Sequence, residues 1–404
     1  MSTLLQINTT LNLGSTGRIA EQIAIMAEAQ GWNCYIAHGA RYVNPSKIHS
    51  IQIGTKWSNI LHAIIGEYLG MHGFGSTLAT YIFIRKVKKI KPDVIHLHNL
   101  HGYYINIAIL FRYLAKTSIP VIWTLHDCWS FTGHCTHFES HGCYKWKTEC
   151  RDCPLLMLQY KSRLIDRSRK NFRIKKKLYS NIKNLTITPV SNWLGNLVKE
   201  SILKEHRIQV IHNGIDLDLF KPCLSNVKER IGVGNEKKMI LGVVNSGFKG
   251  KKEFIELSKD PNYQVVIVGI RKKWKSDLPD NIICIPRTNS QEELAEFYSA
   301  ADVYVNPTQN DTFPTTNIEA IACGTPVVTY NAGGSPEILD ESTGIVVERN
   351  DIKALHEAVK CILKIGKQHY LKICRDRAIS HFNKNDRFRD YLELYAELAK
   401  SGFK

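Results

Sequence analysis

The sequence predicts an α/β protein built from two doubly wound parallel sheets, and three observations lead to this fold class. Short apolar segments typical of buried strands alternate with helical patterns along most of the chain. With 404 residues the chain is long for a single core and sufficient for two domains. Its hydrophobic content of 44% is ordinary for a globular protein, so disorder is not expected.

The first half of the chain contains a series of strand-like segments. They are LLQI at 4–7, CYIAH at 34–38, DVIHLH at 93–98, PVIWTLH at 120–126 and NLTITPVS at 184–191. A second series continues with RIQVIHNG at 207–214, MILGVVN at 239–245, YQVVIVG at 263–269, NIICIP at 281–286, VYVNP at 303–307 and PVVTY at 326–330. We place the join near 206–216, where HNGID supplies a turn.

This pattern predicts a domain organisation. The predicted parts are an N-terminal domain at 1–208 with a cysteine-rich insert at 128–154, a C-terminal domain at 209–384, and a C-terminal helix at 385–404 that packs back on the N-terminal domain. Ligands of open parallel sheets bind beyond the carboxyl ends of the strands. We therefore expect the two domains to face one another across a cleft that holds the chemistry.

The charge balance points to an anionic partner. The formal net charge is +17, which favours association with phosphates, nucleic acid or an anionic membrane without choosing among them. The N-terminal residues lack a signal-peptide pattern, and no apolar run of about 18 residues occurs, so we expect a cytoplasmic protein. The eleven cysteines are then expected to be reduced, and a clustered set of them favours a metal over disulfides.

Much of the positive charge lies in KSRLIDRSRKNFRIKKK at 161–177, where apolar residues are interspersed. Such a segment is typical of a basic amphipathic helix that lies on the inner face of a membrane as a peripheral anchor. A solvated helix face explains the same pattern equally well, and both interpretations stay open.

The loop after the first strand carries two glycines in LNLGSTGRIAEQIAIMA. Gly14 and Gly17 precede an amphipathic helix that we expect to begin at Arg18. Glycines let a phosphate or a sugar approach the backbone, and a helix N-terminus attracts negative charge. The spacing is not GxGxxG, so an ordinary strand-to-helix turn is an equal alternative.

The most informative segment is PTQNDTFPTTNIEAIACGTPVVTYNAGGSPEIL. Asp311 and Glu319 are separated by seven residues, and a helix is expected to start near Thr316. The backbone N–H groups of Thr315 and Thr316 would then suit a diphosphate, because a helix N-terminus carries unpaired donors and a partial positive charge. Glu319, one turn into the helix, could accept hydrogen bonds from ribose hydroxyls. An exposed loop aspartate and a helix-surface glutamate are the alternatives.

This segment resembles the family 4 group of retaining GT-B glycosyltransferases. The family pattern is two acids separated by seven residues, an EA-x-A-x-G-x-PVV segment and a GG-x-x-E turn, which appear here as D311-TFPTTNI-E319, AIACGTPVV and GGSPE. VIHNGIDLDLFKP at 210–222 is similar to the family's entry into its nucleotide-binding half. The resemblance implies two Rossmann-like domains and transfer of a sugar from a nucleotide-sugar donor to a glycan or lipid-linked acceptor.

The resemblance also implies roles for individual residues. Glu319 would hold the donor ribose, and Asp311 would hold the donor sugar at a position where the family more often has glutamate. In NSGFKGKKEFIEL, Lys249 is the expected phosphate ligand, with Asn245 as a further donor-binding residue. His126, which lies in TLHD at the end of a strand-like run, would lie against the donor sugar. The expected catalytic residues are thus His126, Lys249, Asp311 and Glu319, and the implied reaction proceeds on one face of the sugar with assistance from the leaving phosphate.

A basic residue is expected before Lys249-Gly250, but Phe248 and Gly247 stand there. Lys251 and Lys252 are the alternatives for this role, or are solvated. No DxD motif lies at a convincing strand end, so we expect no catalytic divalent metal.

The cysteine-rich insert predicts a structural zinc site. A C-x-x-C pair and two further cysteines within about twenty residues are typical of four thiolates around zinc. The expected ligands are Cys135, Cys143, Cys150 and Cys153. His134 and His137 are reserve ligands, whereas Cys128 is excluded because it is nearest the strand end. Packed reduced thiols or a disulfide are the alternatives. The HD-x-W-x-FTGHC stretch resembles a subset of family 4 enzymes of bacterial exopolysaccharide assembly, which implies a flap on the acceptor side.

Two other functions compete with sugar transfer. The charge and the cysteines would also suit a zinc-containing nucleic-acid-binding protein, but the basic residues are spread over both halves and no helix with paired histidines follows the cysteines. The same fold could also support epimerisation or hydrolysis of a nucleotide sugar, which the residues exclude poorly.

Overall fold

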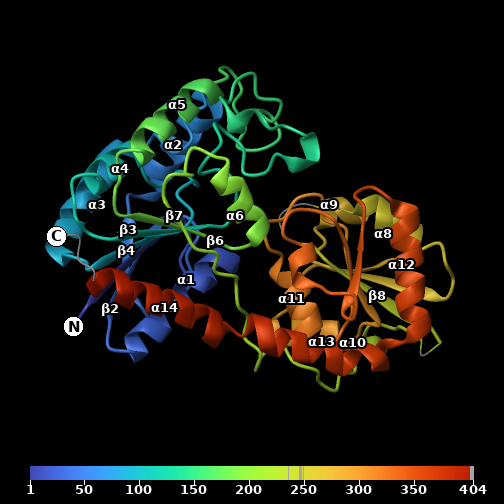
Figure 1. The fold of residues 1–404 in the computed structure, drawn as a ribbon. Coiled ribbons are helices and arrows are strands. Elements are labelled where there is room, and N and C mark those ends of the chain that lie inside the picture. Colours follow the sequence, from blue (N-terminus) through green and yellow to red (C-terminus); the bar gives the residue numbers. More distant parts are fainter. Residues whose placement is uncertain (235, 245–247, 249, 401–404) are drawn as a thin grey trace. The chain divides into compact units, whose positions relative to one another are not determined.

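The computed structural model describes residues 1–234, 236–244, 248 and 250–400 (Figure 1). These residues form two compact units, Met1–His212 with Arg387–Lys404 and Asn213–Asp386. Each unit is an α/β layer structure around a parallel sheet, as the alternation of apolar runs predicts.

The sheet of the first unit has the strand order β3-β2-β1-β4-β5-β6-β7, and all of its pairs are parallel. Its strands are β1 (Thr3–Asn8), β2 (Asn33–Gly39), β3 (His49–Ile53), β4 (Val94–Leu97), β5 (Val121–Leu125), β6 (Leu185–Pro189) and β7 (Arg207–Ile208). Its helices are α1 (Gly14–Ala29), α2 (Lys56–Leu69), α3 (Thr77–Ile90), α4 (Ile107–Leu114), η1 (Glu139–His141), η2 (Lys145–Lys147), α5 (Ser168–Tyr179) and α6 (Asn192–Lys199).

The sheet of the second unit has the order β10-β9-β8-β11-β12-β13, again parallel throughout. Its strands are β8 (Lys238–Val243), β9 (Tyr263–Val268), β10 (Ile283–Ile285), β11 (Val303–Asn306), β12 (Val327–Tyr330) and β13 (Gly344–Val347). Its helices are α7 (Val227–Arg230), α8 (Lys251–Leu257), α9 (Lys272–Lys275), α10 (Gln291–Ala300), α11 (Thr315–Ala322), η3 (Pro336–Ile338), α12 (Ile352–Ile365) and α13 (Lys367–Phe382), followed by α14 (Lys384–Lys400).

In both sheets the first strand along the chain lies in the middle, and the later strands lie on either side of it. Each sheet therefore has a switch point, where the strand order changes direction. In the first unit the switch lies between β1 and β4, and in the second between β8 and β11. At such a point the connections leave on opposite faces, and the carboxyl ends of the two central strands open a crevice for ligands. The two switch points are therefore the places to look for a site.

The structure corrects the predicted start of the second half. The segment 207–214 was expected to begin the second sheet, but its two strand residues, Arg207 and Ile208, pair with Thr186 and Ile187 of β6 at the edge of the first sheet. Two edge strands, β3 and β13, were not predicted; both are only partly buried, β3 lacks a continuous apolar run, and the apolar run of β13 is short.

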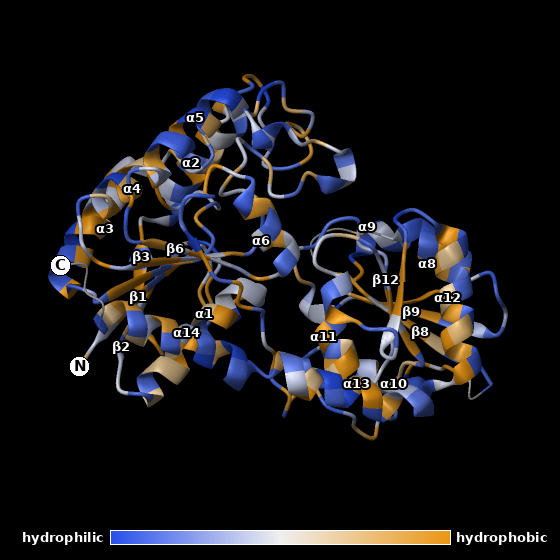
Figure 2. Cartoon of the chain, viewed as in Figure 1, coloured by the Kyte–Doolittle hydropathy of each residue, from blue (hydrophilic) through white to orange (hydrophobic). Residues whose placement is uncertain are grey.

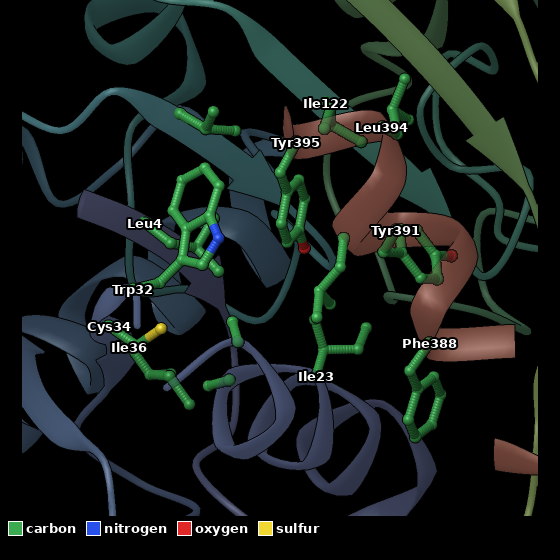
Figure 3. Close-up of a cluster of buried hydrophobic side chains, with 14 of the residues drawn as sticks. Leu4, Ile23, Trp32, Cys34, Ile36, Ile122, Phe388, Tyr391, Leu394 and Tyr395 are labelled. Carbon is green, nitrogen blue, oxygen red and sulfur yellow. The ribbon is translucent and has the colours of Figure 1, made fainter. Parts of the chain in front are cut away.

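The C-terminal helix completes the first core. Phe388, Tyr391 and Tyr395 of α14 are buried and pack beside Ile23 of α1 and Trp32 in one hydrophobic cluster (Figure 3). The hydroxyl of Tyr395 also reaches the sheet, where it lies 2.6 Å from Nδ1 of His96. The last helix is therefore a structural part of the first unit rather than an appendage.

Candidate functional site

The loop after β1 forms one side of the first switch point. Asn8 ends β1, and its side-chain oxygen accepts a hydrogen bond of 3.3 Å from the backbone N–H of Asn99, directly after β4. Its amide donates to the carbonyl of Thr10 at 3.0 Å. The two central strands are thus joined at their carboxyl ends by one buried asparagine.

Gly14 and Gly17 are needed in this loop for different structural reasons. The helix α1 begins at Gly14 rather than at Arg18, and Gly14 has a φ of 69°, a conformation that favours glycine. A Cβ on Gly17 would lie 2.6 Å from Oγ1 of Thr10, so Gly17 lets the loop pack against the first turn. Gly17 therefore has a packing role, whereas no atom lies within 4 Å of a Cβ placed on Gly14.

A chain of hydrogen bonds leads from the core of the first unit to His126. The amide nitrogen of Gln6 donates to the carbonyl of Ala20 at 2.8 Å, which turns its oxygen toward Nε2 of His98 at 2.8 Å. Nδ1 of His98 lies 3.2 Å from Nε2 of His126, after β5. Burial, with His96 and His126 nearby, lowers the pKa of His98 well below its ordinary value, so the ring is neutral.

These contacts define the tautomer of His126. Because Nε2 of His98 donates to Gln6, Nδ1 of His98 must accept, and Nε2 of His126 must donate to it. Burial lowers the pKa of His126 to about 4, although Asp127 beside it opposes the shift. The neutral His126 ring therefore has Nδ1 as its hydrogen-bond acceptor.

A second group of polar residues lies beside His126, and the sequence did not predict that its members contact one another. Nε2 of His101 donates to Oδ2 of Asp127 at 2.6 Å, and the hydroxyl of Tyr160 contacts Nδ1 of the same ring. Burial opposes ionisation of Asp127, but His101 and the backbone N–H of Trp129 keep the pKa of the carboxyl below its ordinary value. A small cavity runs along these residues, lined by parts of 98–101 and 123–130. The sequence contained a pattern that could have indicated this group, since HNLHG follows β4 and His126 and Asp127 follow β5.

In the second unit, Asp311 lies on the loop after β11 and contacts the GGSPE turn. The carbonyl of Asp311 accepts a hydrogen bond of 3.1 Å from the backbone N–H of Gly334. Gly333 has a φ of 59°, and a Cβ there would lie 1.7 Å from that carbonyl oxygen. The carboxylate of Asp311 accepts from the backbone N–H of Phe313 at 3.1 Å. The paired glycines therefore let the acid-bearing loop and the turn approach one another.

Glu319 lies on α11, which begins at Thr315, one residue before the predicted start. No side chain caps this helix, and no acidic residue lies in its first turn. The buried hydroxyl of Tyr298 donates to Oε2 of Glu319 at 3.0 Å and fixes the orientation of the carboxylate. Burial, with the charge of Glu319, raises the pKa of Tyr298 well above its ordinary value, so the tyrosine stays a donor.

Two predicted donor-binding residues, Asn245 and Lys249, lie outside the described residues. Gly250, the next residue, has a φ of 82° and lies against Pro307 at the end of β11, where a Cβ would be 2.1 Å from the proline ring. This contact joins the loop after β8 to the loop after β11 at the second switch point. Lys251, an alternative phosphate ligand, pairs with Asp277 at 3.0 Å.

The cysteine-rich insert contains an aromatic core that the sequence did not suggest. Phe131, Phe138 and Trp146 are buried and in mutual ring contact. The side chain of Gln159 accepts from Thr136 and from the backbone of His137, and its amide donates back to the His137 carbonyl at 2.7 Å. The insert is therefore held by an aromatic core of its own and by the hydrogen bonds of Gln159.

The four predicted zinc ligands lie near one another, since Cys153, Cys150 and Cys143 add to the burial that raises the pKa of Cys135. Sγ of Cys150 also accepts a hydrogen bond from the backbone N–H of Gly133 at 3.2 Å. Within the described residues, however, no three His, Cys, Asp or Glu side chains are arranged so that they could hold a metal ion. His134, a reserve ligand, contacts the carbonyl of Gln159 instead. Zinc stays a prediction.

Comparison with known protein families shows which family the chain belongs to. A model described as Glycosyltransferase Family 4 matches residues 18–219, and one described as Glycosyl transferases group 1 matches residues 228–378. The chain belongs to glycosyltransferase family 4. The first match covers most of the unit that contains His98, His101 and His126. The second match lies within the unit that contains Asp311 and Glu319.

Curated relatives of the enzyme are distant. A protein of Escherichia coli named as a colanic acid biosynthesis glycosyl transferase, WcaC, is 26% identical over 285 residues, which cover 67% of each chain. The sulfoquinovosyl transferase SQD2 of Arabidopsis thaliana is 26% identical over 42% of this chain and 36% of its own. The chain thus spans about two thirds of the first relative and little more than a third of the second.

Solved structures confirm the GT-B fold of this glycosyltransferase. Sucrose-phosphate synthase from Thermosynechococcus elongatus aligns with a TM-score of 0.75 at 17% identity, over 99% of this chain and 100% of that chain. HepE of Anabaena, solved in complex with UDP, aligns with a TM-score of 0.68 at 13% identity, over 98% of this chain and 100% of that chain. The predicted fold class, two Rossmann-like parallel sheets, is therefore correct.

No helix among the described residues is both long and apolar enough to cross a membrane.

Proposed function

We propose that this glycosyltransferase transfers a sugar from a nucleotide-sugar donor to a glycan or lipid-linked acceptor, with retention of the anomeric configuration, in the synthesis of a bacterial-type surface polysaccharide. The family gives the reaction class, and the relative WcaC, named for colanic acid biosynthesis, supports the pathway class. The observation that carries the proposal is the grouping of Asp311, Glu319 and the start of α11 beside the second switch point.

In the proposed donor site each part has a separate task. Glu319, oriented by Tyr298, accepts hydrogen bonds from the ribose hydroxyls. The uncapped N-terminus of α11 offers backbone donors to the diphosphate, where negative charge grows as the glycosidic bond breaks. Lys249, although outside the described residues, is assigned to the same phosphates. Asp311 holds the donor sugar from the loop fixed by Gly333 and Gly334.

His126 is proposed to accept a hydrogen bond from a hydroxyl of the donor sugar through Nδ1. The tautomer defined by Gln6 and His98 supports this direction, because the other ring nitrogen is used as a donor. Attack of the acceptor on the face that the diphosphate leaves would give retention, with the leaving phosphate taking the acceptor proton. That transfer needs no carboxylate nucleophile and no divalent metal.

Zinc in the insert is a separate proposal. Proximity of the four thiols supports it, and a bound ion would fix the insert in place without taking part in the reaction.

The donor site is tested by thermal denaturation with UDP, GDP, ADP and TDP sugars. A ligand that binds the folded state raises the melting temperature by mass action, so one nucleotide series should give a selective shift. Glu319→Ala should weaken that donor by at least about tenfold, because a pair of charge-assisted hydrogen bonds is lost. Glu357→Ala, an exposed acid on α12 of the same unit, is the matched control.

Normal donor affinity in Glu319→Ala would refute the donor site. The anomeric proton coupling of the product in NMR tests retention separately. Donor consumed at full rate without any acceptor would favour the hydrolase or epimerase alternative.

A further inference from the structure

Helix α2 is amphipathic in the reverse of the usual sense. Its buried positions are Asn59, His62 and Gly66, which are polar or small. A helix of a globular protein normally buries its apolar stripe and exposes its polar residues. The inward side of α2 is instead held by hydrogen bonds, since His62 contacts the Ser76 hydroxyl at 3.0 Å and accepts from the backbone of Gly75.

The outward side of α2 carries the large apolar residues. Trp57 is 80% exposed and Leu61 58%, and Ile60, Ile64 and Tyr68 are exposed as well. Their spacing of three, four and seven residues puts them on one stripe. Isolated exposed apolar residues are common, but a complete apolar stripe facing outward indicates an interaction surface.

Helix α3 extends this stripe. Ser76 at its start contacts His62 of α2, and a Cβ on Gly54, just before α2, would lie 3.1 Å from Ala79. Leu78, Tyr81 and Ile82 of α3 are exposed, with Leu78 at 73%. We call the exposed apolar residues of the two helices the α2–α3 face.

A loop joins the face at the other end of α2. The backbone N–H groups of Arg163 and Leu164 donate to the carbonyls of Glu67 and Tyr68. Leu164 is 70% exposed and Ile165 45%. These two residues, which the sequence pattern placed in a basic helix, therefore extend the α2–α3 face.

The border of the face is basic. After Ile82, helix α3 exposes Arg85, Lys86, Lys88 and Lys89, and it contains no acidic residue. Figure 1 shows α3, α4 and α5 on one side of the first sheet, and α5 is a mostly hydrophilic helix (Figure 2).

The apolar residues of helix α5 point inward, which favours a solvated helix face for this part of 161–177. Phe172 and Leu178 are buried, and the buried ammonium of Lys175 donates to the carbonyl of Trp129 at 2.6 Å. The outward side of α5 therefore contributes charge, and α2 with α3 contributes the apolar contact.

We propose that the α2–α3 face is a docking surface for an anionic lipid bilayer. Apolar residues of α2 and α3 would enter the headgroup region, Trp57 and the two tyrosines would lie at the interface, and the lysines and arginines would contact lipid phosphates. The proposal goes beyond sugar transfer and does not depend on it.

Charge decides against the other occupants. A second copy of the chain docked through the same patch would bring two basic borders together, which is unfavourable for a chain with a net charge of +17. Nucleic acid would match the charge but would leave the apolar stripe in water.

The test is sedimentation of the full chain with sucrose-loaded vesicles, without any sugar donor. The protein should bind vesicles of phosphatidylcholine with about a third phosphatidylglycerol, bind pure phosphatidylcholine far less, and dissociate as salt is raised. The double variant Leu61→Glu, Ile64→Glu should lower the partition coefficient by at least about tenfold. The matched control is Leu224→Glu with Ile365→Glu, two exposed apolar residues of the second unit, which should bind as the parent does.

A fluorescence readout avoids reliance on charge variants. Brominated acyl chains should quench the emission of Trp57, and the quenching should disappear in Trp57→Phe, whose circular dichroism melt checks the fold. No binding of the parent to anionic vesicles would overturn the proposal, as would normal binding of the Leu61, Ile64 variant. A self-association that this variant abolishes, in the absence of vesicle binding, would assign the face to a second copy instead.

Discussion

At the scale of single residues, the site depends on side chains whose partners fix their chemical form. Gln6 fixes the tautomer of His98 and through it that of His126, while Tyr298 fixes one carboxylate oxygen of Glu319. In each case the outer residue is the one that a family pattern identifies, and the inner residue is a buried polar group with no motif of its own. The geometry of the candidate site therefore depends on core residues.

The contact between Gly333 and Asp311 gives a residue-scale prediction. Gly333→Ala would put a Cβ 1.7 Å from a backbone oxygen at a positive φ, so we expect a loss of about 1–3 kcal/mol in unfolding free energy and a weakened donor. The control is Gly232→Ala in the same unit, where φ is 74° but no atom lies within 4 Å. Urea unfolding and donor-induced melting shifts measure both effects. Equal losses in the two variants would show that backbone strain alone matters.

At the scale of elements, the insert at 128–154 shows how a polar segment is held with two short helical turns, η1 and η2, as its regular secondary structure. Its aromatic core and the hydrogen bonds of Gln159 already connect it to the residues that follow. A metal would add to this framework rather than replace it. The thiols stay protonated at neutral pH when no metal is bound, because burial raises the pKa of Cys150 to about 12 and of Cys153 to about 11.

The zinc proposal is tested by elemental analysis of protein purified under reducing conditions. One equivalent of zinc is expected, and it should be lost in Cys150→Ser with Cys153→Ser. Cys284→Ser with Cys361→Ser, cysteines far from the insert in sequence, should retain the metal. Metal-free protein that melts at the same temperature with and without added zinc would leave packed thiols as the explanation.

At the scale of the whole molecule, the two units differ in their titratable interiors. The first unit buries several histidines in neutral form, because burial lowers the pKa of His62 to about 4 and of His72 to about 3 as well as that of His126. The histidines of the second unit, at 356, 369 and 381, are not buried. The first unit should therefore be the more sensitive to acid.

The sign of this effect follows from linkage. Between about pH 6.5 and about pH 4 the unfolded chain binds protons that the folded unit excludes, so stability falls as the pH falls, by up to about 1.4 kcal/mol per pH unit for each such histidine. Tryptophan emission reports this unit, because Trp274 is the only tryptophan of the second unit in the sequence and Trp274→Phe removes it. The urea midpoint should be lower at pH 5 than at pH 7.5. A midpoint that is equal at pH 5 and pH 7.5 would contradict the neutral, buried state of these rings.

The order of residues was sufficient to predict the fold class, most of the central strands, and the segment with Asp311, Glu319 and the two glycines as the candidate site. Prediction was possible because buried strands need continuous apolar runs, and because the two acids and the glycines lie at fixed spacing in one short stretch. The folded chain was needed to see that 207–208 belongs to the first sheet, that His101, Asp127 and Tyr160 form one group, and that α2 presents its apolar side outward. These features depend on contacts between residues far apart in the chain, and an amphipathic pattern does not say which side of a helix faces the core.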